Sequence, residues 1–260
     1  MANEPQAAAN SAANIVRIDR EKHKNIKVKR NPDVPQATKL HLSSVVAREF
    51  PQAATNFPVV FIKDSNSGRF LAVCLFGFEE SENLFFENGK WAATYVPMNI
   101  GRYPFAIDVA ENADKKAVVY PCLDQSSSLV NEEEGNALFD AEGKETEYLQ
   151  NMSKYLGDLF QSEMITQQFI RTVADMELVQ AMDFGLELAS GEKRSVTGIY
   201  TVNQEKMQSL EDDKLLQLHK KGYLGPIYSM LTSLGQVNRM VRLRNKTDGS
   251  KINRLQLQLK

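Results

Sequence analysis

The sequence predicts an α+β fold, with an antiparallel meander sheet in the N-terminal half, a long helix, and then a β-hairpin and C-terminal helices. Short runs rich in Val, Phe and Leu, separated by tight-turn residues, fill the first half of the chain. From Glu147 to Met176, apolar residues recur at the three- and four-residue spacing of a helix. Two further apolar runs flank Gly191 and precede the last amphipathic stretches.

The composition is that of a globular protein: of 260 residues, 42% are hydrophobic and 25% are charged. This length suits one large domain or two small ones. We expect a disordered tail over residues 1–14, which are rich in Ala, Asn and Gln. A single α+β domain over residues 15–246 and a C-terminal extension over 247–260 should follow.

The expected location is the cytoplasm. The first residues lack the positively charged start and apolar core of a secretory signal. No stretch approaches the roughly 18 apolar residues of a membrane span, so we expect no stable membrane insertion. The formal net charge of −2 indicates no strong preference for nucleic acid or anionic lipid.

Residues 15–30 alternate apolar and basic side chains. The basic side chains could form an RNA-binding arm, but no aromatic residues are interleaved to stack on bases. The alternative is an edge strand or an extended arm held by Ile15, Ile18, Ile26 and Val28. We favour the alternative and expect no nucleic-acid partner.

A β-rich block follows. Residues 39–49 suit a strand that turns into a short helix, which Phe50 and Pro51 should end. The later strands, joined by turns such as Asn88-Gly89, read as one antiparallel meander of four to six strands. The main expected strands are 57–64, 69–78, 105–109 and 116–123.

The polar stretch 124–146 contains Glu132, Glu133 and Glu134, which invite a metal-site hypothesis. Three adjacent glutamates cannot all face one ion, and the alternating acidic spacing of a calcium loop is absent. We therefore expect a solvated loop and no metal or other cofactor.

Cys74 and Cys122 both lie in apolar runs. Two strands could bring them together as a disulfide. The alternative is a pair of reduced thiols in the core, where free cysteine is common.

The C-terminal half is predicted to be mostly helical. The long helix could divide at Gly157 or at 162–163, and Asn203 is a plausible N-cap. The last residues alternate Leu with polar residues, as in an added edge strand or a segment that docks on a partner. The expected elements are a helix over 147–176, hairpin strands over 178–190 and 195–202, and helices over 204–209, 210–221 and 224–243.

The segment YVPMNIGRYPF, residues 95–105, carries the best ligand-site candidate. Arg102 could bind a carboxylate or phosphate through two hydrogen bonds, with aromatic side chains as walls. The alternative is that Arg102 pairs with an internal acid such as Asp108 or Asp140. The candidate ligand-binding residues are Trp91, Tyr95, Arg102, Tyr103 and Asp140.

Two of these candidates have simpler explanations. Trp91 could belong to the core, and turn chemistry could account for Asp140. The sequence contains no Gly-rich phosphate loop and no Gly-x-Ser-x-Gly nucleophile motif, so it identifies no catalytic residue.

Five stretches of the chain resemble the SapC family, a bacterial family named for a link to surface-layer proteins, and the resemblance covers roughly residues 15–244. The stretches are IDREKHKNIKV, EFPQAATNFPVVF, YVPMNIGRYPF, LFDAEGKETEYLQNM and GIYTVNQEKMQSLEDDKLLQLHKKGYLGPIYSMLTSLGQVNRM.

The resemblance implies a non-enzymatic accessory or binding protein linked to nutrient uptake, natural-product modification or surface-layer processes. Its implied protein partners are associated with uptake receptors, or are halogenase-like or cupin-like enzymes. The alternative is an enzyme or small-molecule-binding subunit with an anionic-ligand site around Arg102. We also expect a homodimer, because exposed strand edges and the Leu-rich tail need covering.

Overall fold

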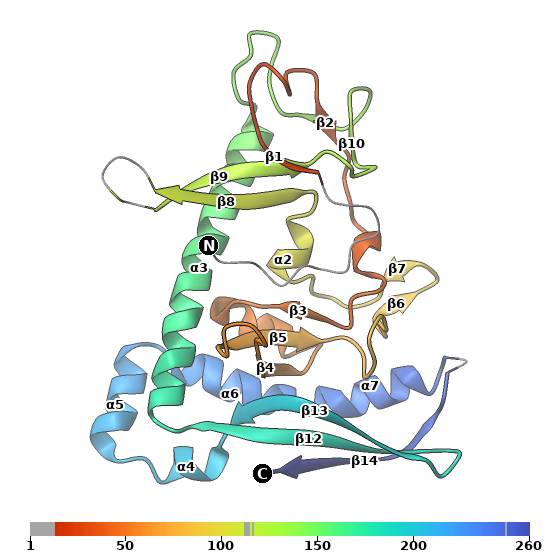
Figure 1. Ribbon diagram of the computed structural model, residues 1–260, viewed down its shortest axis with the longest axis vertical. Coiled ribbons are helices and arrows are strands. Elements are labelled where there is room, and N and C mark those ends of the chain that lie inside the picture. Colours follow the sequence, from red (N-terminus) through yellow and green to blue (C-terminus); the bar gives the residue numbers. More distant parts are fainter. Residues whose placement is uncertain (1–13, 112–114, 116, 248) are drawn as a thin grey trace. The chain divides into compact units, whose positions relative to one another are not determined.

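The computed structural model describes residues 14–260 except 112–114, 116 and 248, so the expected tail lies almost entirely outside the described residues. Its mixture of helices and antiparallel sheets confirms the α+β class (Figure 1). The chain forms two compact units. Unit 1 comprises Met1–Pro35 and Met98–Gln161, and unit 2 comprises Gln36–Pro97 and Ser162–Lys260.

Unit 1 contains two small antiparallel sheets, with strand orders β1-β9-β8 and β10-β2-β11, and the first part of the long helix α3. Its elements are β1 (Ile15–Arg17), β2 (Lys27–Val28), α2 (Met98–Gly101), β8 (Phe105–Glu111), β9 (Ala117–Asp124), β10 (Val130–Asn131), β11 (Asn136–Ala137) and α3 (Glu147–Asp175).

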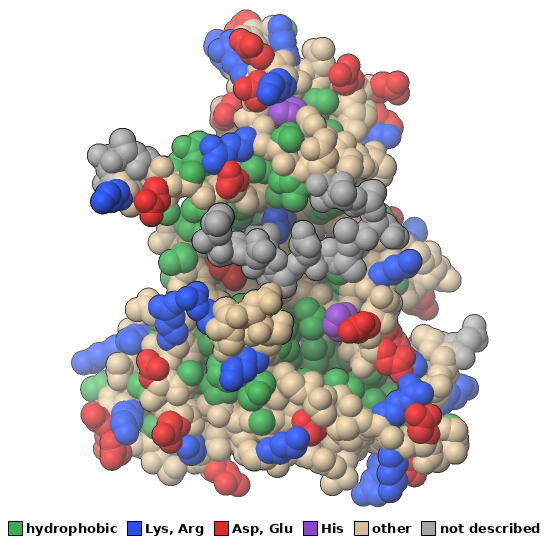
Figure 2. All heavy atoms as spheres, viewed as in Figure 1, with side chains coloured by type: hydrophobic (Ala, Val, Ile, Leu, Met, Phe, Trp, Pro, Cys, Tyr) green, Lys and Arg blue, Asp and Glu red, His purple; other side chains and the backbone are tan. Residues whose placement is uncertain are grey.

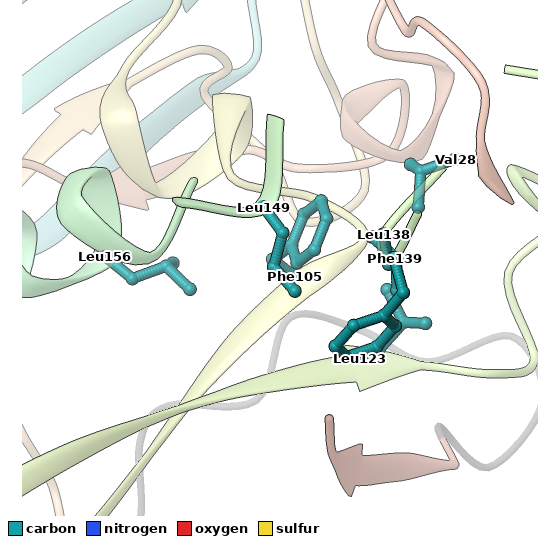
Figure 3. Packing of buried hydrophobic residues seen from close by; sticks show 7 residues of the cluster. All are labelled: Val28, Phe105, Leu123, Leu138, Phe139, Leu149 and Leu156. Carbon is teal, nitrogen blue, oxygen red and sulfur yellow. The ribbon is translucent and has the colours of Figure 1, made fainter. Parts of the chain in front are cut away.

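The core of unit 1 collects apolar side chains from both sheets and from α3 (Figure 3). The fully buried members are Val28, Phe105, Leu123, Leu138, Phe139, Leu149 and Leu156. Val28 comes from the alternating basic arm, which Val28, Ile18 and Ile26 hold against this core. The arm forms two short strands separated by turns over residues 20–25. Removal of these apolar side chains from water stabilises the fold of unit 1.

Unit 2 is built on a six-stranded sheet with the order β14-β12-β13-β4-β5-β3, beside the small β6–β7 hairpin. Its strands are β3 (Leu42–Ser44), β4 (Val59–Lys63), β5 (Phe70–Leu75), β6 (Phe86–Glu87), β7 (Lys90–Trp91), β12 (Val179–Leu188), β13 (Lys193–Val202) and β14 (Ile252–Leu259). Its helices, besides the end of α3, are η2 (Ala47–Glu49), α1 (Phe50–Ala53), α4 (Gln204–Gln208), α5 (Asp212–Lys220), α6 (Leu224–Ser233) and α7 (Gln236–Arg244); the short helix η1 (Pro35–Ala37) begins at the unit boundary.

Aromatic side chains dominate the core of unit 2. The buried ring of Phe169, on α3, packs against Phe50 at 6.0 Å, Phe61 at 6.2 Å and Tyr223 at 5.2 Å between centroids. Most of these rings meet edge to face, the arrangement that their quadrupoles favour. Phe169 therefore joins α3 to the sheet and to the C-terminal helices of the same unit.

The expected single meander is replaced by two separate sheets. The local hairpins β4–β5 and β8–β9 form as expected, but the second edge of β5 pairs with β3 and the second edge of β4 pairs with β13. Turn residues determine which neighbouring strands pair in a hairpin. Which distant strand pairs with the other edge of the hairpin depends on long-range burial. The pattern of residues along the sequence indicates the hairpins but not these distant pairings.

Two helix boundaries also differ from expectation. Helix α1 begins at Phe50 instead of ending there, because Pro51 occupies the first turn, where a missing N–H costs nothing. The single helix expected over 224–243 is two helices that meet near Gly235. The buried hydroxyl of Ser233 hydrogen-bonds with the Val59 backbone of β4, which ties down the end of α6.

Helix α3 runs unbroken for 29 residues, so it does not divide at Gly157 or at 162–163 as considered above. Other local expectations are confirmed. The Asn203 side chain caps α4 by accepting a hydrogen bond from the Lys206 amide at 2.9 Å. Asn88, Gly89 and Gly191 take positive φ angles in their hairpin turns.

No helix within the described residues is both long and apolar enough to cross a bilayer.

The C-terminal extension is an added edge strand. β14 pairs antiparallel with β12 from Leu259 opposite Met182 to Ile252 opposite Leu188. The Asn245 side chain fixes its start, since Nδ2 donates to the Ile252 carbonyl at 2.9 Å and Oδ1 accepts from the Ile252 amide at 2.7 Å.

We predict that Phe169→Ala lowers the free energy of unfolding by about 3–5 kcal/mol, because it leaves a cavity among three aromatic rings. Urea unfolding followed by circular dichroism measures the change. The exposed neighbour Ile165 on α3 supplies the control, and Ile165→Ala should cost less than about 1 kcal/mol. Equal losses in the two variants would contradict the assigned core.

Candidate functional site

Arg102 lies in unit 1, directly after α2, and its guanidinium is held in place by nearby groups. Nε donates to Asn99 Oδ1 at 3.2 Å, and Nη1 donates to the Phe105 carbonyl at 3.2 Å. The Phe105 amide in turn donates to the Arg102 carbonyl at 2.7 Å, which closes the turn into β8. The side chain of Arg102 is therefore oriented by the residues three positions before and after it.

The two acids considered as internal partners of Arg102 are engaged elsewhere. Asp108 forms an ion pair with Arg17 at 2.5 Å, and the Arg17 guanidinium also stacks over the Tyr120 ring at 4.0 Å. Asp140 Oδ1 accepts hydrogen bonds from the amides of Glu142 and Lys144, at 2.9 and 2.8 Å. These contacts support the view of Asp140 as a turn residue, since Asp commonly closes such turns.

Trp91 and Tyr95 lie in unit 2 and are joined by a hydrogen bond from Trp91 Nε1 to the Tyr95 carbonyl at 2.9 Å. The Trp91 ring packs on Phe57, Phe76 and Phe86, with centroids 5.4–5.9 Å apart. These contacts favour the interpretation of Trp91 as part of an aromatic core.

Beyond Tyr95 lies a buried carboxylate that the sequence did not indicate. Glu49 is only 3% exposed. Its Oε1 accepts from the Tyr95 hydroxyl at 2.5 Å, and its Oε2 accepts from the Val46 amide at 3.1 Å. A buried charge needs such donors, because burial without them is costly. The signal in the sequence is a single acid in the apolar stretch VVAREF.

The thiol of Cys74 lies near this carboxylate. Burial raises the pKa of Cys74, and the negative charge of Glu49 raises it further. The pKa of Cys122 is also raised, mainly by burial. Both cysteines are free and buried, which agrees with the reduced-thiol interpretation.

The five candidate ligand-binding residues thus fall into two groups. Trp91 and Tyr95 are brought together within unit 2, whereas Arg102, Tyr103 and Asp140 belong to unit 1. Arg102 and Tyr103 are adjacent, while Asp140 serves its own turn. A shared ligand site of all five stays a prediction.

The acidic run and the basic arm of unit 1 contact each other. Lys29 forms an ion pair with Glu134, and Lys27 Nζ donates to the Glu133 carbonyl at 2.9 Å. Lys29 also lowers the pKa of Glu134, first through its hydrogen bond and then through its charge. Among the described residues, no group of three or more His, Cys, Asp or Glu could hold a metal ion.

Figure 2 shows acidic and basic side chains interspersed over the visible face.

Two helices of unit 2 expose apolar side chains, and a hollow lies between the same two helices. A surface pocket of about 590 Å³ lies between the end of α3 and α5. Helix α5 buries Leu218 but leaves Leu215 and Leu216 37% and 49% exposed. On α3, the exposed side chains of Met164 and Ile165 precede the pocket. We call these four exposed residues and the pocket the α3–α5 surface.

We predict that Tyr95→Phe destabilises the protein by about 1.5–3 kcal/mol, because it removes a hydrogen bond to the buried Glu49 carboxylate. The exposed Tyr228 provides a matched control, and Tyr228→Phe should change stability by less than about 0.5 kcal/mol. Chemical denaturation of both variants measures the difference. If Tyr95→Phe left the stability unchanged, burial of the Glu49 carboxylate would not depend on the Tyr95 hydroxyl.

Comparison with known proteins gives a match to one family. The SapC family model matches residues 18–240, which include most of both units. No curated protein and no solved structure matches the chain. Because the family model covers well over half of the sequence, the chain belongs to the SapC family.

Proposed function

We propose that this SapC-family protein is a non-enzymatic accessory protein that works by docking on a protein partner. The observation that carries the proposal is helix α5, which has nine residues and buries only Leu218. Amphipathic helices of a folded domain normally place their apolar stripe against the core. A helix that leaves Leu215 and Leu216 in solvent suits an interface with another molecule.

The shape of the α3–α5 surface fits a helical segment of a partner. Ile165, Thr172 and Met176 are spaced along one side of α3, and the last two line the pocket. The facing wall comes from Lys214, Gln217 and Lys221 of α5 and the turn after it. The hollow between the two helices is lined mainly by polar and charged side chains, with Met176 as the apolar member of the lining.

The charges around this hollow restrict the partner further. Its lining includes both acids and bases, and several of them are already paired, such as Glu177 with Lys206 at 3.1 Å and Lys214 with Glu211 at 3.3 Å. Exposed apolar side chains together with a polar surface of mixed charge are typical of transient protein interfaces. We infer a partner helix with an apolar stripe flanked by charges of both signs.

The resemblance to the family supports the biological setting. It implies partners among uptake-receptor-associated proteins or halogenase-like and cupin-like enzymes, and roles in nutrient uptake, natural-product modification or surface-layer processes. A cytoplasmic location belongs to the same proposal.

The test is binding to purified candidate partners of these classes, measured by isothermal titration calorimetry. We predict that Ile165→Glu combined with Leu216→Glu weakens binding at least tenfold, because it places charges on two exposed apolar side chains of the surface. Val109→Glu changes an exposed apolar residue of unit 1 and should leave the Kd unchanged. Equal effects of the two changes, or no binding by any candidate, would contradict the proposal.

A second candidate function is an anionic-ligand site at Arg102, in an enzyme or small-molecule-binding subunit. The supporting observation is the fixed orientation of its guanidinium by Asn99 and Phe105. A guanidinium oriented in advance loses less side-chain entropy when it binds a carboxylate or phosphate.

Inorganic phosphate is a direct probe of this site. We predict that phosphate raises the Tm of the wild-type protein and that Arg102→Ala removes this increase, while Arg171→Ala, on the exposed side of α3, keeps it. Thermal unfolding at constant ionic strength, with chloride in place of phosphate, measures the specific effect. The same increase in Arg102→Ala would eliminate the site.

A further inference from the structure

The six-stranded sheet of unit 2 ends in two very different edge strands. β3 has three residues, of which Ser43 is buried, whereas β14 has eight residues that are mostly exposed. Figure 1 shows β14 as the outermost strand of this sheet, beside β12. A long exposed edge strand offers unpaired backbone groups to another strand, and proteins usually cover or interrupt such edges.

The register of β14 shows which of its backbone groups point outward. The Lys260 amide donates to the Ala181 carbonyl at 3.0 Å, so Lys260 occupies a hydrogen-bonded position opposite β12. Antiparallel ladders alternate between hydrogen-bonded and non-hydrogen-bonded positions. The amides and carbonyls of Leu255, Leu257 and Leu259 therefore point away from β12, toward the open side.

The same three residues carry the apolar side chains of the strand. They lie opposite Leu186, Phe184 and Met182 of β12, all of which are buried. Directly opposite residues share a face of the sheet, so the leucines extend the buried face of unit 2. At the edge this face is only partly covered, since Leu257 is 40% and Leu259 is 60% exposed.

We propose that β14 is a self-association edge, on which the β14 strand of a second copy of this chain pairs antiparallel about a two-fold axis at Gln256. The two six-stranded sheets then form one continuous sheet, and Leu257 of each copy packs on Leu255 of the other. This interface is separate from the α3–α5 surface, and it does not depend on the docking function proposed there.

The sequence of β14 favours this register. Outward-pointing positions must face each other, so the axis passes through a residue and not between residues. An axis at Leu257 puts Arg254 opposite Lys260, and like charges directly opposite are destabilising. An axis at Leu255 puts Leu257 opposite Asn253, and an axis at Gln258 leaves only residues 256–260 to pair. An axis at Gln256 pairs residues 253–259, puts Leu255 opposite Leu257 and opposes no like charges.

The edge is also fixed in position, as a template must be. Asn245 holds the start of β14 through its two hydrogen bonds with Ile252, and Arg244 Nε donates to the Ser250 carbonyl at 3.2 Å. At the other end, Lys260 forms an ion pair with Asp183 of β12 at 2.5 Å.

Disulfide cross-linking tests the register. In the proposed dimer the two Gln256 residues form a non-hydrogen-bonded pair with Cα atoms about 4.5 Å apart, within reach of a disulfide. The two Gln258 residues lie roughly 13 Å apart, four strand positions from each other. We predict that Gln256→Cys forms a covalent dimer on mild oxidation and that the matched variant Gln258→Cys does not. We expect no cross-links through Cys74 and Cys122, because both are buried and their pKa values are raised.

Sedimentation of the full-length wild-type protein gives the second measurement, with a dimer expected. A monomer at 100 µM would overturn the proposal. Equal cross-linking of the two variants would also overturn it, since that result fits another register or random collision. A wild-type dimer in which Gln256→Cys fails to cross-link would place the interface elsewhere and reject β14.

Discussion

The apolar spacing of helix α3 is the constraint on which both units depend. One 29-residue helix supplies Leu149 and Leu156 to the core of unit 1, and Phe169 and Val173 to the core of unit 2. Within each core, the buried positions of the helix keep a three- and four-residue spacing. In unit 2, an insertion between Thr166, which bonds the Ala47 amide, and Phe169 would rotate Phe169 by about 100° and move it out of its aromatic cluster.

Within unit 2 the buried face of α3 includes two polar residues, Ser162 and Thr166, and Thr166 has a hydrogen-bonding role. Thr166 Oγ1 accepts a hydrogen bond from the Ala47 amide at 2.8 Å, at the start of η2, and donates to the Ser162 carbonyl at 2.7 Å. The amide would otherwise be buried without a partner. Next to it, Val46 and Tyr95 satisfy the Glu49 carboxylate. The aromatic core of unit 2 is thus bordered by a small set of polar groups that satisfy one another.

Features whose determinants lie within a few residues could be predicted from the sequence. The Asn88-Gly89 turn, the Asn203 cap and the turn role of Asp140 are of this kind. The division of the strands between two sheets could not, because it depends on β13, more than one hundred residues beyond β4. The Tyr95–Glu49 contact could not be predicted either, since the two residues are 46 positions apart and the sequence around each gives no indication of the other. Trp91 and Arg102, which the sequence grouped, belong to different units, and a site shared by the two stays a prediction.

The ordered C-terminus has a practical consequence for handling the protein. Lys260, directly after β14, is held on the sheet by the hydrogen bond from its amide to the Ala181 carbonyl and by its ion pair with Asp183. A purification tag or fluorescent protein fused after Lys260 would begin at the end of this edge strand. Fusions at this end would therefore alter the edge that they border, and a label for quantitative work is better placed in the exposed turn 65–68 between β4 and β5.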